Sequence, residues 1–311
     1  VCKMSLSVAI VGLPNVGKST LFNALLKRQQ AYVANFPFAT IEPNIGVVPV
    51  PDRRLERLAD VVEKELNPST LLRTSRPPIV PAVVQFLDIA GLIAGAHKGE
   101  GLGNKFLSHI RETDAVCHVV RAFSDPDIIK QGVVDPKTDL EIVETELVLA
   151  DFQTLEKQKD PGNTPNKELQ KWWAVVLKLK EALQKGIPAR EVDLSDEEKI
   201  WEKQLSLLTS KPVLVVLNVD EKDLKEANKI ELKFADEVGL HSSQVVAISA
   251  KIESELSSLS EGDQKNYLED LGVKEGGLER LITRAFETLG LITFLTGGEK
   301  EVRAWTIKKD A

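Results

Sequence analysis

A glycine-lysine loop near the N-terminus is the strongest chemical signal in this sequence. Residues 12–19 read Gly-Leu-Pro-Asn-Val-Gly-Lys-Ser and match the spacing G-x-x-x-x-G-K-[ST]. In such a loop the backbone N–H groups and the start of the next helix surround the β-phosphate of a nucleotide. We expect Lys18 to bridge the β- and γ-phosphate oxygens and the Ser19 hydroxyl to bind Mg²⁺. The residues expected to hold the phosphates are Asn15, Val16, Gly17, Lys18, Ser19 and Thr20.

A second motif suited to a metal–phosphate site is D-x-x-G at residues 88–91. Behind a phosphate loop, Asp88 is expected to hold Mg²⁺ through water, and Gly91 to sense the γ-phosphate. Thr40, in the loop after the first expected helix, is a candidate second hydroxyl ligand of the metal; the alternative is an ordinary loop threonine. Residues 95–103 contain four glycines. They form either a loop that reports the nucleotide state or a plain surface loop.

The residue after the D-x-x-G motif is Leu92, where Ras-like enzymes carry a glutamine that orients the attacking water. Leucine has no polar side-chain atom, so either hydrolysis is slow or another group positions the water. Asn15 is a candidate for placing a monovalent cation near the phosphates. His97, Lys98 and Lys130 are further catalytic candidates, with solvated loop residues as the alternative.

A base-binding motif is expected at residues 218–221, Asn-Val-Asp-Glu, which directly follow an apolar strand. Guanine-nucleotide switches carry N-K-x-D there, and the aspartate accepts hydrogen bonds from guanine. Glu221 takes the place of that aspartate, and Val219 replaces the lysine. This change should reduce guanine preference, and Asn218 is able to meet an adenine N6/N7 edge. Residues 249–251, Ser-Ala-Lys, are expected to form the last base-contacting loop, with Ser249 and Ala250 at the nucleotide.

These motifs need a sheet whose strand ends meet at one edge. Apolar, β-branched runs predict strands at residues 5–11, 46–50, 83–87, 115–120, 213–217 and 245–248. Helical spacing at 20–27, 53–65 and 277–290 completes the pattern, and 67–81 is expected to be an extended loop. Continuous apolar runs are typical of parallel strands covered on both faces. The sequence therefore predicts a Ras-like α/β fold of the P-loop NTPase class with a mostly parallel sheet.

Two segments depart from this alternation of strands and helices. Residues 139–157, 167–185 and 196–208 have helical spacing without an intervening strand. They predict either a projecting hairpin of long helices or two ordinary helices that cover the sheet. The tail at 292–295 and 302–307 predicts two strands about Gly297-Gly298. Because a hairpin alone is marginal in water, we expect the start of a truncated third domain.

Composition limits the classes of partner. The chain has 311 residues, 40 Lys plus Arg against 47 Asp plus Glu, and a net charge of −7, which argues against a nucleic-acid-binding coat over the whole surface. Its two cysteines exclude a disulfide framework. No apolar run approaches the about 20 residues that span a bilayer. We expect a cytoplasmic monomer without a membrane partner, or an organellar protein if residues 1–3 end a cleaved leader.

Taken together, these motifs closely resemble the Obg-like ATPase (YchF) family of P-loop NTPases. The resemblance covers nearly the whole chain and includes 12–20, 35–44, 88–91, 98–104, 218–221 and 249–253. It implies ATP binding with reduced GTP preference, Mg²⁺, and hydrolysis with a hydrophobic residue at Leu92. It further implies K⁺ stimulation, a coiled-coil insertion at about 125–210, and association with the ribosome or ribosomal RNA in translation or stress regulation. Residues 301–306 resemble the start of the family's C-terminal TGS domain.

Two residues depart from the family pattern. Relatives commonly carry a histidine where this chain has Lys130, and often a small residue at His97, so we expect His97 to take over part of the water positioning. The expected domains are a discontinuous nucleotide domain at 5–124 and 211–290, a helical insertion at 125–210, and the TGS start at 291–311. An ATP-hydrolysing switch on ribosomes is the first functional prediction. A GTPase, or an ATP/GTP-gated scaffold with incidental hydrolysis, is the alternative. A small-molecule kinase is disfavoured because no acceptor pocket is evident.

Overall fold

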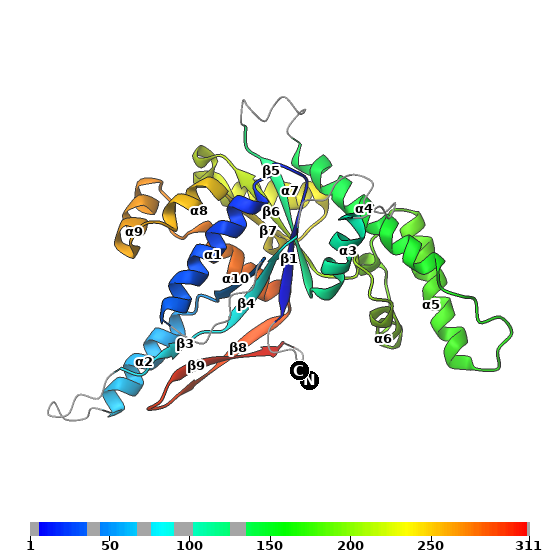
Figure 1. Ribbon diagram of the computed structural model, residues 1–311, viewed down its shortest axis with the longest axis horizontal. Coiled ribbons are helices and arrows are strands. Elements are labelled where there is room, and N and C mark those ends of the chain that lie inside the picture. Colours follow the sequence, from blue (N-terminus) through cyan, green and yellow to red (C-terminus); the bar gives the residue numbers. More distant parts are fainter. Residues whose placement is uncertain (1–5, 36–43, 67–75, 90–101, 125–134, 310–311) are drawn as a thin grey trace.

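The computed structural model describes residues 6–35, 44–66, 76–89, 102–124 and 135–309, and within them a six-stranded sheet forms the centre of the molecule (Figure 1). Its strand order is β2-β4-β1-β5-β6-β7. The strands are β1 (Ser7–Val11), β2 (Ile45–Pro49), β4 (Val83–Asp88), β5 (Ala115–Ala122), β6 (Val213–Val219) and β7 (Val245–Ile248). β2 runs antiparallel to β4, and the other neighbouring strands are parallel. The predicted mostly parallel α/β fold is confirmed.

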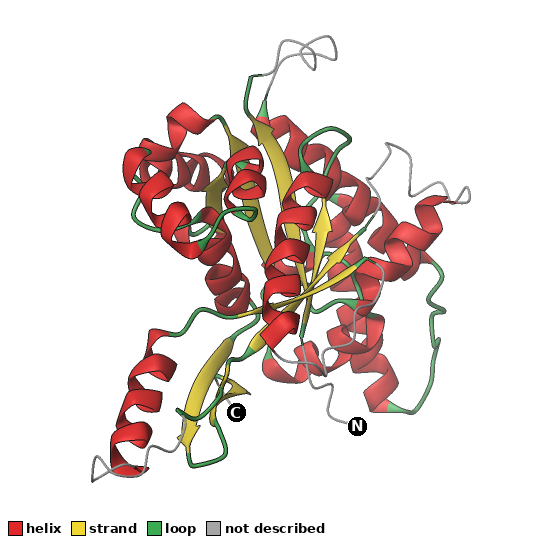
Figure 2. Cartoon of the chain, turned by 60° about the vertical axis from the view of Figure 1, so that its left-hand side comes forward, coloured by secondary structure: helices red, strands yellow, loops and turns green. Residues whose placement is uncertain are grey.

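Helices cover both faces of this sheet (Figure 2). One face carries α1 (Lys18–Asn35), α8 (Ala250–Leu256) and α10 (Gly277–Thr288), and the other carries α3 (Leu102–Glu112), α4 (Pro136–Glu156) and α7 (Ala227–Val238). Alternate residues of β1 enter the two cores: Val8 and Ile10 pack with the first set of helices, and Ala9 and Val11 with the second set. A strand buried on both sides has no polar face, which explains its continuous apolar sequence.

A helical arm lies between β5 and β6 and consists of α4, α5 (Lys167–Gln184) and α6 (Asp196–Leu205). Local caps set its helix starts: the Asn166 side chain accepts N–H groups of α5, and Ser195 forms a capping box with Glu198 at α6. Ser206 then adopts a left-handed backbone with φ of 50°, so α6 ends before the predicted limit at residue 208. Figure 1 shows α5 and α6 projecting away from the sheet.

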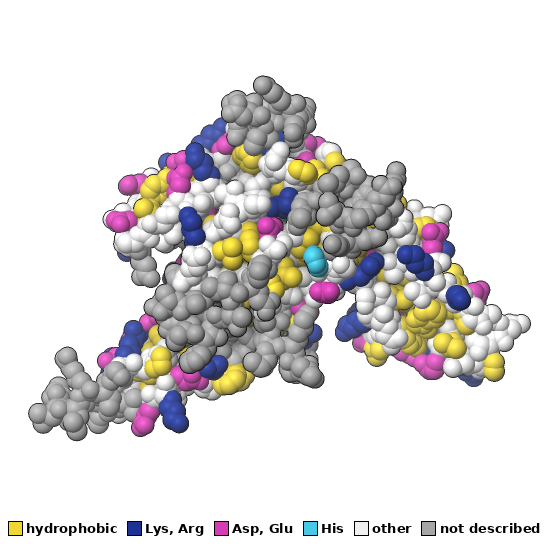
Figure 3. All heavy atoms as spheres, viewed as in Figure 1, with side chains coloured by type: hydrophobic (Ala, Val, Ile, Leu, Met, Phe, Trp, Pro, Cys, Tyr) yellow, Lys and Arg dark blue, Asp and Glu magenta, His cyan; other side chains and the backbone are white. Residues whose placement is uncertain are grey.

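The structure combines the two alternatives that the sequence left open for this arm. Val143 and Leu147 of α4 pack into the core beneath the sheet, whereas Val148 and Leu155 pack with α5. Thus α4 covers the sheet, and α5 and α6 project from it. In the view of Figure 3, hydrophobic side chains gather over this projecting part. The exposed large apolar residues that the arm contributes include Leu169, Leu177 and Ile200.

A second, three-stranded sheet has the order β3-β9-β8. The two predicted tail strands are present as β8 (Leu291–Gly297) and β9 (Val302–Lys308), whereas β3 (Ile79–Val80) lies in a stretch predicted to be a loop. Leu291, Val302 and Ala304 share one buried cluster with residues of α2 (Arg53–Leu66) and of the central sheet. The hairpin is therefore supported by a third strand and by a helix. Among the helices that the structure describes, none combines the length and apolar character that crossing a bilayer requires.

Candidate functional site

The glycine-lysine loop lies between the end of β1 and the start of α1, as the sequence predicts. Asn15 and Gly17 have positive φ angles of 62° and 98°. A Cβ atom added at Gly17 would overlap with Nδ2 of Asn218, so the close approach of a side chain from β6 demands glycine here. The loop therefore packs closely against the strand that carries Asn218.

Lys18, the first residue of α1, is only 7% exposed, and its Nζ donates a hydrogen bond to the Leu13 carbonyl at 2.6 Å. Burial lowers the pKa of Lys18, and the negative charge of Asp88 partly offsets this effect. Burial likewise raises the pKa of Asp88, opposed by the charge of Lys18. The charges of the two predicted residues thus act on each other, with Lys18 at the start of α1 and Asp88 at the end of β4.

The donor set near this loop fits Mg²⁺. The Ser19 hydroxyl and the Asp88 carboxylate are hard oxygen ligands, and Mg²⁺ usually takes one or two such protein ligands together with phosphates and waters. In the part of the chain that the structure describes, no group of three or more His, Cys, Asp and Glu side chains forms an all-protein metal cage. A site completed by a phosphate ligand is the arrangement that these residues suit. Thr40, the other predicted ligand, lies outside the described residues.

Asn218, near the end of β6, connects two other segments of the site. Its Nδ2 donates to the Val16 carbonyl and its Oδ1 accepts from the Ala250 N–H, both at 2.9 Å. The side chain is buried, with 6% of its surface exposed. Asn218 also lines the cavity, and its amide joins the phosphate loop to the start of α8. The expected contact with an adenine edge stays a prediction.

The base end of the site consists of residues at, or directly after, the carboxyl ends of β5, β6 and β7. Val219, Ser249 and Ala250 are buried and line the cavity, as the sequence predicts, and Glu221 lines it from an exposed position. Asp220 accepts hydrogen bonds from the backbone and the hydroxyl of Ser124, at 3.1 and 2.9 Å. Asp220 thereby ties the end of β6 to the end of β5.

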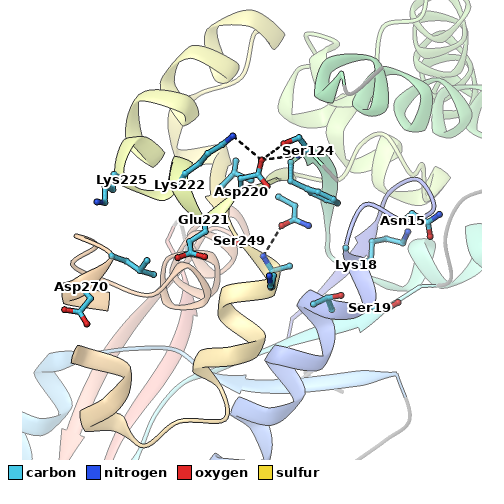
Figure 4. Close-up of a pocket in the computed structure, with 18 residues that line it drawn as sticks. Asn15, Lys18, Ser19, Ser124, Asp220, Glu221, Lys222, Lys225, Ser249 and Asp270 are labelled. Carbon is cyan, nitrogen blue, oxygen red and sulfur yellow. Dashed lines mark hydrogen bonds and ion pairs between the residues drawn. The ribbon is translucent and has the colours of Figure 1, made fainter. Parts of the chain in front are cut away.

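One cavity of about 1100 Å³ includes both halves of this site (Figure 4). Asn15, Lys18 and Ser19 lie at one end, and Glu221, Lys225 and Asp270 at the other. The lining residues that lie outside the predicted site motifs are Phe123, Ser124, Lys222, Lys225, Asp270 and Leu271. The rule that ligands bind at the carboxyl ends of parallel strands could have found Phe123 and Ser124, which follow β5. Asp270 and Leu271 carry no such signal.

Several predicted residues lie outside the described part of the chain. They are Thr40, Gly91, Leu92 and His97, together with Lys98 and Lys130. The structure thus brings together the phosphate loop, Asp88 and the base-side residues. The expected γ-phosphate sensor and the candidates for orienting water stay predictions.

Comparisons with known proteins agree with this arrangement. A family model described as "50S ribosome-binding GTPase" matches residues 7–161. The "Ribosome-binding ATPase YchF" of Bacillus subtilis is 47% identical over 98% of this chain and 82% of that protein. Its namesake from Haemophilus influenzae is 44% identical over 99% of this chain and 82% of that protein. A solved structure titled "Structure of the Schizosaccharomyces pombe YchF GTPase" superposes with a TM-score of 0.81 at 35% identity and covers 99% of this chain and 82% of that one.

Proposed function

The chain belongs to the YchF family of ribosome-binding ATPases, and from this premise we propose that it is an Mg²⁺-dependent switch that hydrolyses nucleotides, prefers ATP to GTP, and acts on the ribosome. The observation that carries the proposal is one cavity that is lined at one end by buried Lys18, whose charge interacts with that of Asp88, and at the other end by Glu221. That cavity offers a cation for phosphates at one end and room for a base at the other.

At the phosphate end of the cavity, backbone N–H groups and three side chains would bind the phosphates and Mg²⁺. The backbone N–H groups of the loop and the N-terminus of α1 would hold the β-phosphate. Lys18 would exchange its hydrogen bond to the Leu13 carbonyl for phosphate oxygens. Ser19 and, through water, Asp88 would hold Mg²⁺, whose charge neutralises the phosphates when it is bound. Thr40 and Gly91 complete this proposal as a second hydroxyl ligand and as the γ-phosphate contact.

The proposed preference for ATP rests on the residues that follow β6. Glu221 stands where guanine-specific sites have an aspartate, and its side chain is longer by one methylene group. It is exposed and is the first residue of the 3₁₀ turn η4 (Glu221–Glu226). Val219 is buried and supplies no lysine stem to cover a base. GTP is the second candidate substrate, because the matching family model and the fission-yeast structure are both described as GTPases.

The proposed catalytic group differs from the glutamine of Ras-like enzymes, since Leu92 has no polar side-chain atom. Asn15 lines the phosphate end of the cavity, and we propose that it helps to place K⁺ there. Replacing K⁺ by Na⁺ should then lower turnover of the wild type but not of Asn15→Ala. His97 remains the proposed water-positioning residue; a His97→Ala variant with full turnover would exclude that role.

The proposed domain division assigns nucleotide binding to 5–124 and 211–290, an arm to 125–210, and a TGS start to 291–311. The arm joins the sheet through α4, which places it at the side of β5. A change at the nucleotide site could reach a bound ribosome through such an arm. Ribosome binding by this chain is inferred from its membership of a family of ribosome-binding ATPases.

Titration calorimetry with non-hydrolysable ATP and GTP analogues in the presence of Mg²⁺ tests the proposal. We expect ATP to bind at least about tenfold more tightly, a difference of about 1.4 kcal/mol. Lys18→Ala serves as the site control and should abolish binding of both analogues. Tighter binding of GTP would overturn the substrate assignment. Turnover that does not respond to added ribosomes would instead favour a nucleotide-gated scaffold.

A further inference from the structure

Helix α9 (Glu261–Asp270) is not explained by packing. It begins at Ser260, whose side chain accepts the Asp263 N–H, and none of its described side chains is buried. Apart from half-buried Tyr267 and Leu268, its larger side chains are polar, so a hydrophobic core contributes little to holding this helix in place. Its C-terminal end nevertheless reaches the cavity, which both Asp270 and Leu271 line. The role of α9 therefore has to be sought at that end.

The end of α9 is fixed by a helix-terminating turn. Gly272 has a φ of 70°, its N–H bonds to the Glu269 carbonyl at 2.9 Å, and the Val273 N–H bonds to the Leu268 carbonyl at 2.9 Å. This pair of hydrogen bonds satisfies the last carbonyl groups of the helix and gives the following backbone one direction. Leu271, directly before the glycine, is consequently held at a defined position in the cavity wall.

Two contacts join α9 to the segments that bear the base motifs. A Cβ atom at Gly272 would lie 3.6 Å from Cε of Lys225, so the lysine stem packs against the glycine. Lys225 belongs to η4, which starts at Glu221. The Tyr267 hydroxyl contacts a carboxylate oxygen of Glu255 in α8, the helix that begins at the Ser-Ala-Lys motif, at 3.5 Å. The end of α9 thus borders both base-side segments.

We propose that Leu271 is a base-binding residue: its side chain covers the heteroaromatic base of the nucleoside triphosphate, on the wall opposite the phosphate loop. This inference rests on the proposed function. In Figure 4, Asp270 lies at the end of the cavity away from Lys18 and Ser19. The carboxylate of Asp270 and the partially negative C-terminus of α9 disfavour phosphate at this end. An apolar side chain there suits a flat base.

The test measures the binding of two probes, a non-hydrolysable ATP analogue and inorganic tripolyphosphate, both with Mg²⁺. Leu271→Ala should bind the ATP analogue about five- to tenfold more weakly, because the truncation removes apolar contact. It should bind tripolyphosphate within about twofold of the wild type, since the phosphate loop is unchanged. Leu271→Met, which keeps the apolar reach, should restore the affinity for ATP. Leu259→Ala is the matched control: this leucine is 39% exposed and does not line the cavity.

The outcomes separate this inference from the proposed function. Wild-type affinity for ATP in a folded Leu271→Ala protein overturns the inference, as does an equal loss of tripolyphosphate binding. If the alanine variant does not fold, Leu271→Asn, which keeps the side-chain size, should show the same selective loss. If the wild type binds GTP more tightly than ATP, the proposed preference fails. The role of Leu271 is then tested by comparing how Leu271→Ala changes the affinity for the GTP analogue and the affinity for tripolyphosphate, with the same criteria.

Discussion

Glu144 provides an ionic contact between the helical arm and the central sheet. From α4, its Oε1 lies 3.1 Å from Nε2 of His118 in β5, and its Oε2 lies 2.9 Å from Nη2 of Arg190. Arg190 belongs to the 3₁₀ turn η3 (Ala189–Glu191) between α5 and α6. The His118 side chain is fully buried, and Glu144 and Arg190 are 16% and 17% exposed. One carboxylate therefore serves a buried histidine and a cation from a distant part of the arm.

The contribution of these contacts to folding stability follows from the pKa of Glu144. Burial by itself would raise that pKa, but the neighbouring His118 and Arg190 outweigh it and lower the pKa from 4.5 to about 2. A carboxyl group whose pKa is lower in the folded state stabilises the protein above its unfolded pKa. The difference corresponds to about 3 kcal/mol at neutral pH. This contribution should be lost as the pH falls from about 4.5 towards about 2.

The substitution Glu144→Gln should lower the free energy of unfolding at pH 7 by about 3 kcal/mol, because it leaves the cation of Arg190 largely buried without its carboxylate. Denaturant titration followed by circular dichroism measures this loss. The difference in free energy of unfolding between wild type and variant should be less than half as large at pH 3 as at pH 7. Glu141→Gln, an exposed site one turn earlier on the same helix, is the matched control and should change stability by less than about 0.5 kcal/mol. A loss under about 1 kcal/mol, or a gap that does not change with pH, would refute the reasoning.

Three further predictions concern the site and the sheet edge. Gly17→Ala should weaken ATP binding by more than tenfold in calorimetry with the fold retained in circular dichroism, because the methyl group overlaps with Asn218 and the residue has a φ of 98°. Asn218→Ala should lower the free energy of unfolding in urea by about 2 kcal/mol, since it leaves two buried backbone groups unpaired, and should also weaken nucleotide binding. Arg280→Met should destabilise the protein by about 3 kcal/mol in the same assay. The substitution removes the 2.6 Å contact between Arg280 and buried Glu231. In the wild type, Glu231 accepts the Ala247 N–H and Arg280 donates to the Ala247 carbonyl, so the pair satisfies the backbone of the edge strand β7.

The sequence was sufficient to predict the strand–loop–helix around Lys18, the apolar strand that ends at Asp88, and the apolar strand that precedes Glu221. Those features are local, since each depends on residue spacing within a short window. It could not decide how α4 packs. Val143 and Leu147 face the sheet, whereas Val148 and Leu155 face α5. A helix buried on two sides has little amphipathic contrast, so periodicity alone cannot tell a sheet-covering helix from a projecting one.

The parts of the site that the sequence did not predict depend on contacts between distant segments. The Asp220–Ser124 pair joins residues 96 positions apart, and the bond from Asn218 to Val16 spans 202 positions. Motif spacing can indicate that such residues belong to one site, but not which atoms pair. Leu271 follows a polar helix without any recognisable motif. Its place in the cavity wall comes from the turn at the end of α9 and cannot be predicted from local pattern.

The two bonds of Asn218 also bear on how this site could distinguish one base from another. Because the amide holds the phosphate loop and the start of α8 together, changing Asn218 would alter the positions of both ends of a nucleotide at once. A group with such a structural role is poorly placed to change base preference independently of phosphate binding. Glu221, in contrast, is exposed at the cavity wall beyond the buried strand, where its length can change without disturbing the loop. We therefore expect base preference to depend on Glu221 and its neighbours, and Asn218 to affect all nucleotides alike.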